Sequence, residues 1–122
     1  MSAIHLVDDS ATMLMSMEML LKRAGYTVTK SESAEAAMAA LESISPKLII
    51  TDLNMPGMNG IELIQTLKKQ SKFRFTPMLM LTTESQQSRR EEAKSAGATG
   101  WLVKPVEPEQ LLGVVKQLVP TA

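Results

Sequence analysis

The residues with the clearest chemical potential are three aspartates, a threonine and a lysine, each of which directly follows an apolar run of strand length. They are Asp8 and Asp9 after the first run, Asp52 after the third, Thr82 after the fourth and Lys104 after the fifth. The chain has ten Glu but only these three Asp, so the acidic groups that hydrate the surface are supplied by Glu. The short Asp side chain holds its carboxylate close to a strand end, which suits a metal ion or a phosphoryl group.

Three carboxylates brought together repel one another, which raises the pKa of at least one of them unless cations neutralise the cluster. Lys104 supplies one positive charge, and a hard divalent cation with oxygen ligands, Mg²⁺, would supply the rest. An ionised Asp52 could then act as a nucleophile towards phosphorus. Taken alone, Asp52 could equally be a helix cap or a turn residue, and Asp8 or Asp9 could simply cap the first helix. The combination of strand-end residues is what favours chemistry.

The elements that must position these residues alternate along the chain. Strands are expected at 3–7, 26–29, 48–51, 78–81 and 98–103. A first helix between Ser10 and Gly25 is capped by Asp9 or Ser10, and a second is capped by Ser33 and packs through Ala34 to Ile44. Further helices are expected at 59–70, 86–96 and 108–119, the last opened by Pro108.

Five strand–helix units predict an α/β fold with a parallel sheet covered by helices on both faces. Right-handed crossovers favour a single doubly wound, five-stranded, flavodoxin-like sheet with strand order 2-1-3-4-5 and five helices. In that wiring the five strand-end residues face one crevice beside strands one and three. At 122 residues, the chain is expected to be one domain, 1–122, with no room for an output domain.

The composition excludes several classes of function. Apolar residues make up 44% of the chain, no apolar run could span a bilayer, and the N-terminus lacks a secretory signal. Thirteen basic and thirteen acidic residues balance, and cysteine is absent, so we expect a cytoplasmic protein that binds neither nucleic acid nor membrane. The basic, aromatic segment 68–75 could suggest nucleic acid, but a lysine-rich helix C-terminus explains most of it.

The strand-end residues, together with the segment Met55-Pro56-Gly57-Met58-Asn59-Gly60 and the pair Lys104-Pro105, resemble the receiver domain of bacterial two-component response regulators. The resemblance covers essentially the whole chain. Asn54 and the run 97–105 look like the stand-alone chemotaxis regulators of the CheY type. Membership would make the protein a response regulator and a phosphoprotein that takes part in two-component signal transduction.

The resemblance implies a role for each site residue. Asp52 would be the phosphoacceptor, and Mg²⁺ would be bound by Asp9 and Asp52 directly, with help from Asp8 and from the backbone carbonyl of Asn54. Lys104 would pair with the phosphoryl group, and its bond to Pro105 is expected to be cis. Asn54 and Glu84 would tune the lifetime of the phosphorylated state. The protein would not be a conventional enzyme, although it would catalyse its own phosphorylation and dephosphorylation.

The resemblance also implies a switch and partners. The Thr82 hydroxyl would bond a phosphoryl oxygen, and Trp101 would then turn from exposed to buried. For Trp101, a switch role and a simple packing role both stay open. A histidine kinase would be the phosphodonor, and the downstream target would be the flagellar motor switch or a phosphatase. We expect a monomer.

Two helices suggest where a partner docks. The helix at 86–96 can bury little more than alanine methyl groups, so it can be repositioned cheaply. The last helix carries more apolar surface than one core-facing stripe requires, and Gly113 in its interior indicates close approach by another surface. These features favour a docking face on helix four, strand five and helix five. His5, within an apolar strand, is expected to be a packed residue rather than a phosphate carrier.

Other functions remain open at this stage. A phosphorylation-independent adaptor would not need the acidic set, Thr82 or Lys104. A flavodoxin-like cofactor binder would need a phosphate-cradling loop where Asp8 and Asp9 stand, and a phosphohydrolase would need a second acid where Asn54 stands. Among true receivers, the favoured interpretation is a regulator that signals to the flagellar motor in chemotaxis, and a phosphorelay shuttle and a phosphate sink stay open as alternatives.

Overall fold

The computed structural model describes residues 3–83 and 87–120. Its elements follow one another in strict alternation. The strands are β1 (Ala3–Val7), β2 (Thr27–Ser31), β3 (Leu48–Asp52), β4 (Met78–Thr82) and β5 (Gly100–Val103). The helices are α1 (Ala11–Arg23), α2 (Ala34–Ala40), α3 (Gly60–Lys68), α4 (Gln87–Ala96) and α5 (Pro108–Leu118), with a short 3₁₀ turn, η1 (Ser71–Phe73), before β4.

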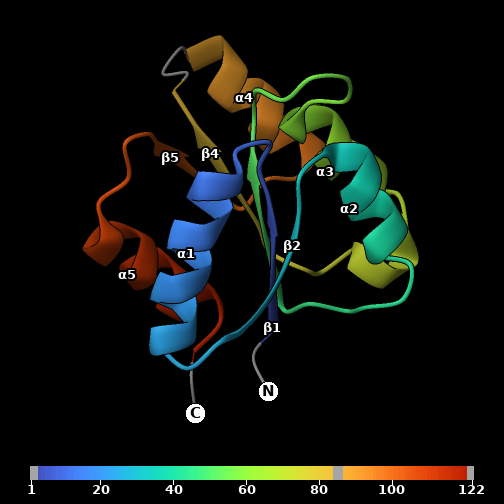
Figure 1. Cartoon of the computed structure of the whole chain (residues 1–122). Helices are drawn as coiled ribbons and strands as arrows, with labels where there is room; N and C mark the ends of the chain where they lie inside the picture. Colours follow the sequence, from blue (N-terminus) through green and yellow to red (C-terminus); the bar gives the residue numbers. More distant parts are fainter. Residues whose placement is uncertain (1–2, 84–86, 121–122) are drawn as a thin grey trace.

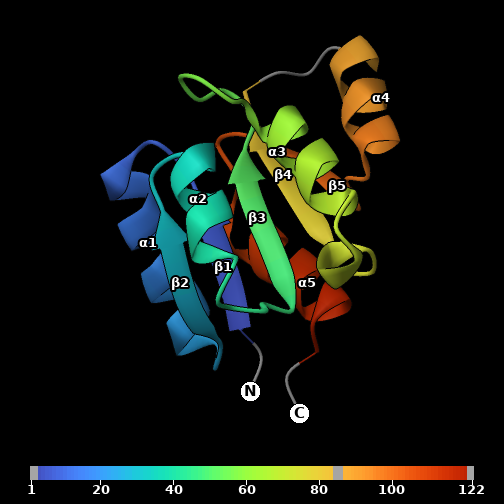
Figure 2. The same cartoon turned by 90° about the vertical axis from the view of Figure 1, so that its right-hand side faces the viewer.

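The five strands form one sheet in the order β2-β1-β3-β4-β5, and every neighbouring pair is parallel. The predicted fold class and strand order are therefore confirmed. Helices α1 and α5 cover one face of the sheet, whereas α2 and α3 cover the other (Figure 1). Seen from the side, α4 lies beyond α3 near the β4–β5 end of the sheet (Figure 2).

Each face of the sheet has its own apolar core. On one side, Leu14 and Leu21 of α1 and Val115 of α5 pack with Ile4 and Ile50. On the other, residues of α2 and α3 pack with the opposite faces of the same strands, and Ala93 of α4 joins them. All five residues of β3 and of β4 are buried. Burial on both faces explains why these two strands begin as continuous apolar runs instead of alternating with polar residues; only their last positions, Thr51-Asp52 and Thr82, are polar.

Several predicted boundaries differ from the structure. The second strand spans Thr27–Ser31 instead of 26–29, because its register against β1 extends to the pair Val7 and Ser31. Helix α2 ends at Ala40, so Ile44 reaches the core from the loop that follows it. Asn59 caps α3 instead of starting it, and β5 begins at Gly100 rather than at residue 98.

Within the described ranges, no helix has both the length and the apolar character that crossing a membrane requires.

Candidate functional site

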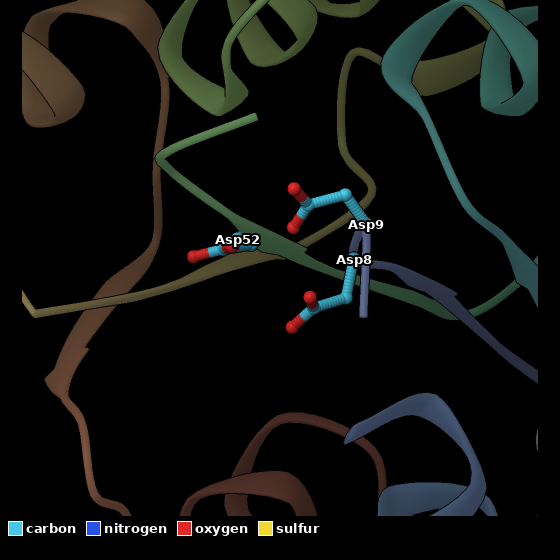
Figure 3. A group of neighbouring side chains, drawn as sticks. All are labelled: Asp8, Asp9 and Asp52. Carbon is cyan, nitrogen blue, oxygen red and sulfur yellow. The ribbon is translucent and has the colours of Figure 1, made fainter. Parts of the chain in front are cut away.

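Three carboxylates meet where β1 and β3 end. Each of Asp8, Asp9 and Asp52 offers a carboxylate oxygen, and these oxygens all lie within 4.8 Å of one another. Figure 3 shows the side chains of Asp8 and Asp9 leaving the end of β1 beside that of Asp52 on β3. Asp8 and Asp52 are buried, at 1% and 7% exposure, while Asp9 is open to solvent. The cluster is thus anchored at its base and accessible from one side.

Strand pairing places Asp8 next to Asp52. Val7 lies opposite Thr51 in the parallel register, so the residues that follow each of them emerge at the same edge. The Asp8 carboxylate is held further by Ser10, whose backbone N–H donates to Oδ1 at 2.9 Å. Ser10 is also the N-cap of α1, with its hydroxyl accepting from Met13 N at 3.3 Å. The choice between Asp9 and Ser10 as the cap is therefore settled in favour of Ser10, which leaves both aspartates available to the cluster.

The opposite wall of the site depends on a close approach between β3 and α3. The Gly60 N–H donates to the carbonyl of Leu53 at 3.0 Å, and a Cβ at position 60 would collide with the carbonyl oxygen of Asp52. Asn59 and Glu62 form a reciprocal capping box that fixes the start of α3. Glycine at position 60 is what allows the helix to begin against the strand end that carries Asp52.

Lys104 reaches the cluster from the end of β5. Its Nζ lies 3.2 Å from Asp8 Oδ2 and 3.2 Å from Asp52 Oδ1, so one ammonium bridges the two buried carboxylates. Its backbone N–H donates to the carbonyl of Thr82 at 2.7 Å, which ties the end of β5 to the end of β4. The Lys104–Pro105 peptide bond is cis, as predicted.

The electrostatics of the site show a shortage of positive charge. Burial raises the pKa of Asp52, Asp8 and Asp9 raise it further, and Lys104 opposes them without prevailing. For Lys104, burial lowers the pKa, but the charges of Asp52 and Asp8 outweigh it and the net shift is upward. One ammonium faces three carboxylates, and all the available ligand atoms are hard oxygens. This donor set and this charge deficit fit a divalent cation such as Mg²⁺.

Thr82 and Asn54 lie together at the neighbouring strand end. Thr82 is fully buried, and the Asn54 side-chain amide donates to its hydroxyl oxygen at 3.4 Å, a long contact. Asn54 itself is exposed. The third residue expected here, Glu84, lies outside the described residues.

Trp101 is half-buried on β5, and its ring packs against the core shared by α2, α3 and α4. Its indole Nε1 is buried with no hydrogen-bond partner among the described residues. A pocket of about 460 Å³ lies beside it, between α4 and β5, with Arg90 and Lys94 in its lining. The indole therefore packs against the protein, while the pocket leaves space next to the ring.

One residue near the site was missed at the sequence level. The carboxylate of Glu35, on α2, accepts a hydrogen bond from the backbone N–H of Met58 at 3.1 Å. Met58 lies in the loop between β3 and α3, six residues after Asp52. No local signal marks this contact, because the two residues are 23 positions apart and an exposed Glu in a helix's first turn is ordinary.

Comparisons with known proteins give a consistent result. The family model of the response regulator receiver domain matches residues 4–116. Protein PilH of Pseudomonas aeruginosa is 30% identical over 119 residues, 98% of this chain and 98% of that protein. The chemotaxis protein CheY of the same organism is 33% identical over 116 residues, 94% of each. The structure of the chemotaxis protein CheY4 of Vibrio cholerae matches with a TM-score of 0.93 and 39% identity, over 98% of this chain and 99% of that one. The chain therefore belongs to the family of response regulator receiver domains.

Proposed function

We propose that the protein is a stand-alone, CheY-like receiver that accepts a phosphoryl group from a histidine kinase on Asp52. The observation that carries this proposal is the bridging of Asp52 and Asp8 by Lys104, with Asp9 open to solvent beside them. An adaptor that works without phosphorylation has no use for this charge arrangement. Residues 1–122 would act as a single domain in the cytoplasm.

The chemistry follows from the positions of the side chains. A carboxylate oxygen of Asp52 attacks phosphorus, so that an oxygen–phosphorus bond forms while the bond to the donor's imidazole nitrogen breaks. Lys104 neutralises negative charge on the transferring oxygens, and the Thr82 hydroxyl donates to one of them. Asp9 and Asp52, with Asp8 and the Asn54 carbonyl, would hold Mg²⁺, which supplies further charge neutralisation when bound. Hydrolysis of the acyl phosphate by water then resets the protein, and Asn54 and Glu84 set its rate.

The output is a change at α4, β5 and α5. Helix α4 contributes Ala93 to the core and is otherwise mostly exposed among its described side chains, so it is weakly anchored. The pocket beside Trp101 lies on this face. We propose that phosphorylation draws Thr82 and the loop after it towards Asp52, and that Trp101 and α4 move in response. The downstream partner is a chemotaxis component, the flagellar motor switch or a phosphatase; similarity to CheY and CheY4 supports this assignment.

The direct test is phosphorylation by acetyl phosphate. With Mg²⁺ present, the unaltered protein should gain one phosphoryl group, detectable by intact-protein mass spectrometry, and chelation by EDTA should abolish the gain. Asp52→Asn should gain none, whereas Glu42→Gln, an exposed carboxylate remote from the cluster, should behave as the unaltered protein does. Phosphorylation that persists in Asp52→Asn would refute the assignment of the acceptor.

A further inference from the structure

The loop between β3 and α3 is held from outside by a single carboxylate of α2. Glu35 Oε2 accepts the Met58 N–H at 3.1 Å, and a Cβ placed on neighbouring Gly57 would lie 2.9 Å from the same oxygen. Gly57 has a φ of +75°, a conformation that suits glycine. The turn at Gly57 and the missing Cβ thus let the backbone come close enough for Glu35 to reach it. Figure 2 shows this loop passing above the start of α2.

The same loop carries Asn54, whose carbonyl is one of the proposed metal ligands. Three other anchors fix the loop. Leu53 N donates to the Leu81 carbonyl at 3.0 Å, Gly60 N donates to the Leu53 carbonyl at 3.0 Å, and the Met55 side chain is buried in the core. The first and the third hold the loop towards the sheet and its core, and the second joins the two ends of the loop. Glu35 holds it from the α2 side, so the position of the Asn54–Met58 backbone depends on both.

The bond has the character of a charge-assisted hydrogen bond. The Met58 N–H lowers the pKa of the Glu35 carboxyl, so the group is ionised at neutral pH and accepts more strongly than an amide oxygen would. Glu35 is exposed, and its carboxylate is positioned by the first turn of α2, which Ser33 caps by accepting from Ala36 N at 3.0 Å. A fixed helix start therefore presents a fixed acceptor to the loop.

We propose that Glu35 is a positioning residue for the metal site: by holding Met58 N, it sets where the Asn54 carbonyl lies relative to the three carboxylates. This inference rests on the proposed function, because it needs Mg²⁺ to bind the cluster. Residues that orient a ligand from outside the coordination sphere commonly change metal affinity when they are removed. Glu35 would do so across the loop, through a contact between two segments distant in sequence.

The test measures Mg²⁺ affinity by calorimetry and the exchange rate of the Met58 amide proton by NMR. Glu35→Ala should raise the Mg²⁺ dissociation constant by about tenfold, the lower end of the range for residues that orient a ligand from outside the coordination sphere, and should accelerate Met58 exchange. Glu35→Gln keeps an acceptor oxygen and should recover most of the affinity. Glu32→Gln, which removes an exposed charge three residues earlier, should change neither quantity.

Each other outcome overturns a specific statement. Faster Met58 exchange in Glu35→Ala with unchanged Mg²⁺ affinity would make Glu35 a structural brace only. Equal loss of affinity in Glu35→Gln and Glu35→Ala would assign the effect to charge instead of position. If the unaltered protein itself fails to bind Mg²⁺, the proposed function is wrong and the inference falls with it.

Discussion

At the scale of single residues, the site holds three carboxylates close together with one ammonium to neutralise them. Asp52 is buried beside Asp8 and near Asp9, and its pKa is raised despite the contact with Lys104. A carboxyl with a raised pKa in the folded state costs stability whenever it is ionised, so at neutral pH Asp52 destabilises the metal-free protein. The proposed function of Asp52 would therefore be obtained at the expense of the stability of the metal-free protein, as is common for groups that do chemistry.

Asp52→Asn should consequently stabilise the metal-free protein. The substitution removes one of three mutually repelling charges and leaves Lys104 paired with Asp8 at 3.2 Å. We expect the melting temperature at pH 7 in EDTA to rise by roughly 3–6 °C, the change typical of about 1 kcal/mol in a domain of this size. Circular dichroism melting measures it. A lower melting temperature for the variant would mean that Asp52 stabilises the fold and that the charge argument is wrong.

The buried His5 side chain should make the folded protein less stable in acid. Burial lowers its pKa from 6.5 to about 4, and its ring nitrogens pair with the neutral hydroxyls of Thr29 and Ser31 at 2.7 and 2.9 Å. The unfolded chain takes up a proton on His5 more readily than the folded protein does. The stability that neutral His5 contributes is therefore fully present above pH 6.5 and is lost as the pH falls towards 4. Between pH 7 and pH 5 the unaltered protein should lose roughly 2 kcal/mol more unfolding free energy than His5→Gln.

Urea denaturation at the two pH values gives this difference directly. Using the difference between the two proteins removes the contribution of carboxylates that titrate in both of them. Parallel losses in the unaltered protein and His5→Gln would show that His5 is protonated equally in the folded and unfolded states.

The meeting of Asp8, Asp9, Asp52 and Lys104 could be predicted from the sequence, because each of these residues follows a strand and parallel strands end at a common edge. The Glu35 contact could not. It depends on how far α2 lies from Met58, 23 positions after Glu35, and that distance is set by packing between helices instead of by any residue pattern. The neighbour expected at Gly113 stays a prediction: among the described residues, nothing lies within 4 Å of a Cβ built there, so a surface that approaches this position would have to come from a partner.

At the scale of elements, two glycines in helices should respond to substitution in opposite directions. Gly60→Ala forces a methyl group against the Asp52 carbonyl and close to the Met80 sulfur, at 3.0 Å. It should destabilise the protein by roughly 1–3 kcal/mol, the cost of overpacking a close contact. Gly113→Ala places a methyl group in open space within α5 and should stabilise it by up to about 1 kcal/mol.

Chemical denaturation of both variants provides the measurement, and each serves as the control for the other. If Gly60→Ala were neutral, the close approach of α3 to β3 would not constrain the site. If Gly113→Ala were destabilising, another surface would have to contact α5 at that position.

Element boundaries were less predictable than element types, and β2 shows why. Tyr26 was expected within the strand, which instead begins at Thr27; the Tyr26 side chain is buried, and its hydroxyl donates to the Val119 carbonyl at 2.7 Å. Polar Lys30 and Ser31 belong to the strand instead, because pairing with Leu6 and Val7 continues that far. Tertiary hydrogen bonding decided the boundary at both ends, against local propensity.

At the scale of the whole molecule, the charged residues of the site and the apolar residues that stabilise the fold lie in different parts of the sheet. Its carboxyl edge gathers the charges of the site, and its two cores fix the strands that carry them. Helix α4 lies at the β4–β5 end and has little apolar character, so moving it would disturb the core mainly through Ala93 and Ala96. A chemical event at Asp52 can therefore alter one surface while the rest of the fold stays as it is.

The free energy of unfolding of the whole domain should therefore report whether a cation occupies the carboxylate cluster. Under the proposed function, Mg²⁺ would bind the folded cluster but would find no preformed site in the unfolded chain, so at ten times its dissociation constant it should add about 1.4 kcal/mol to the unfolding free energy. That corresponds to a rise of roughly 4–8 °C in melting temperature, and NaCl at matched ionic strength should not reproduce it. In Asp9→Asn the rise should be much smaller, since the exposed ligand is neutralised while Asp8, Asp52 and Lys104 remain. An equal rise in that variant would place the bound cation elsewhere on the protein, and the charge deficit at Asp52 would then have to be balanced by Lys104 alone.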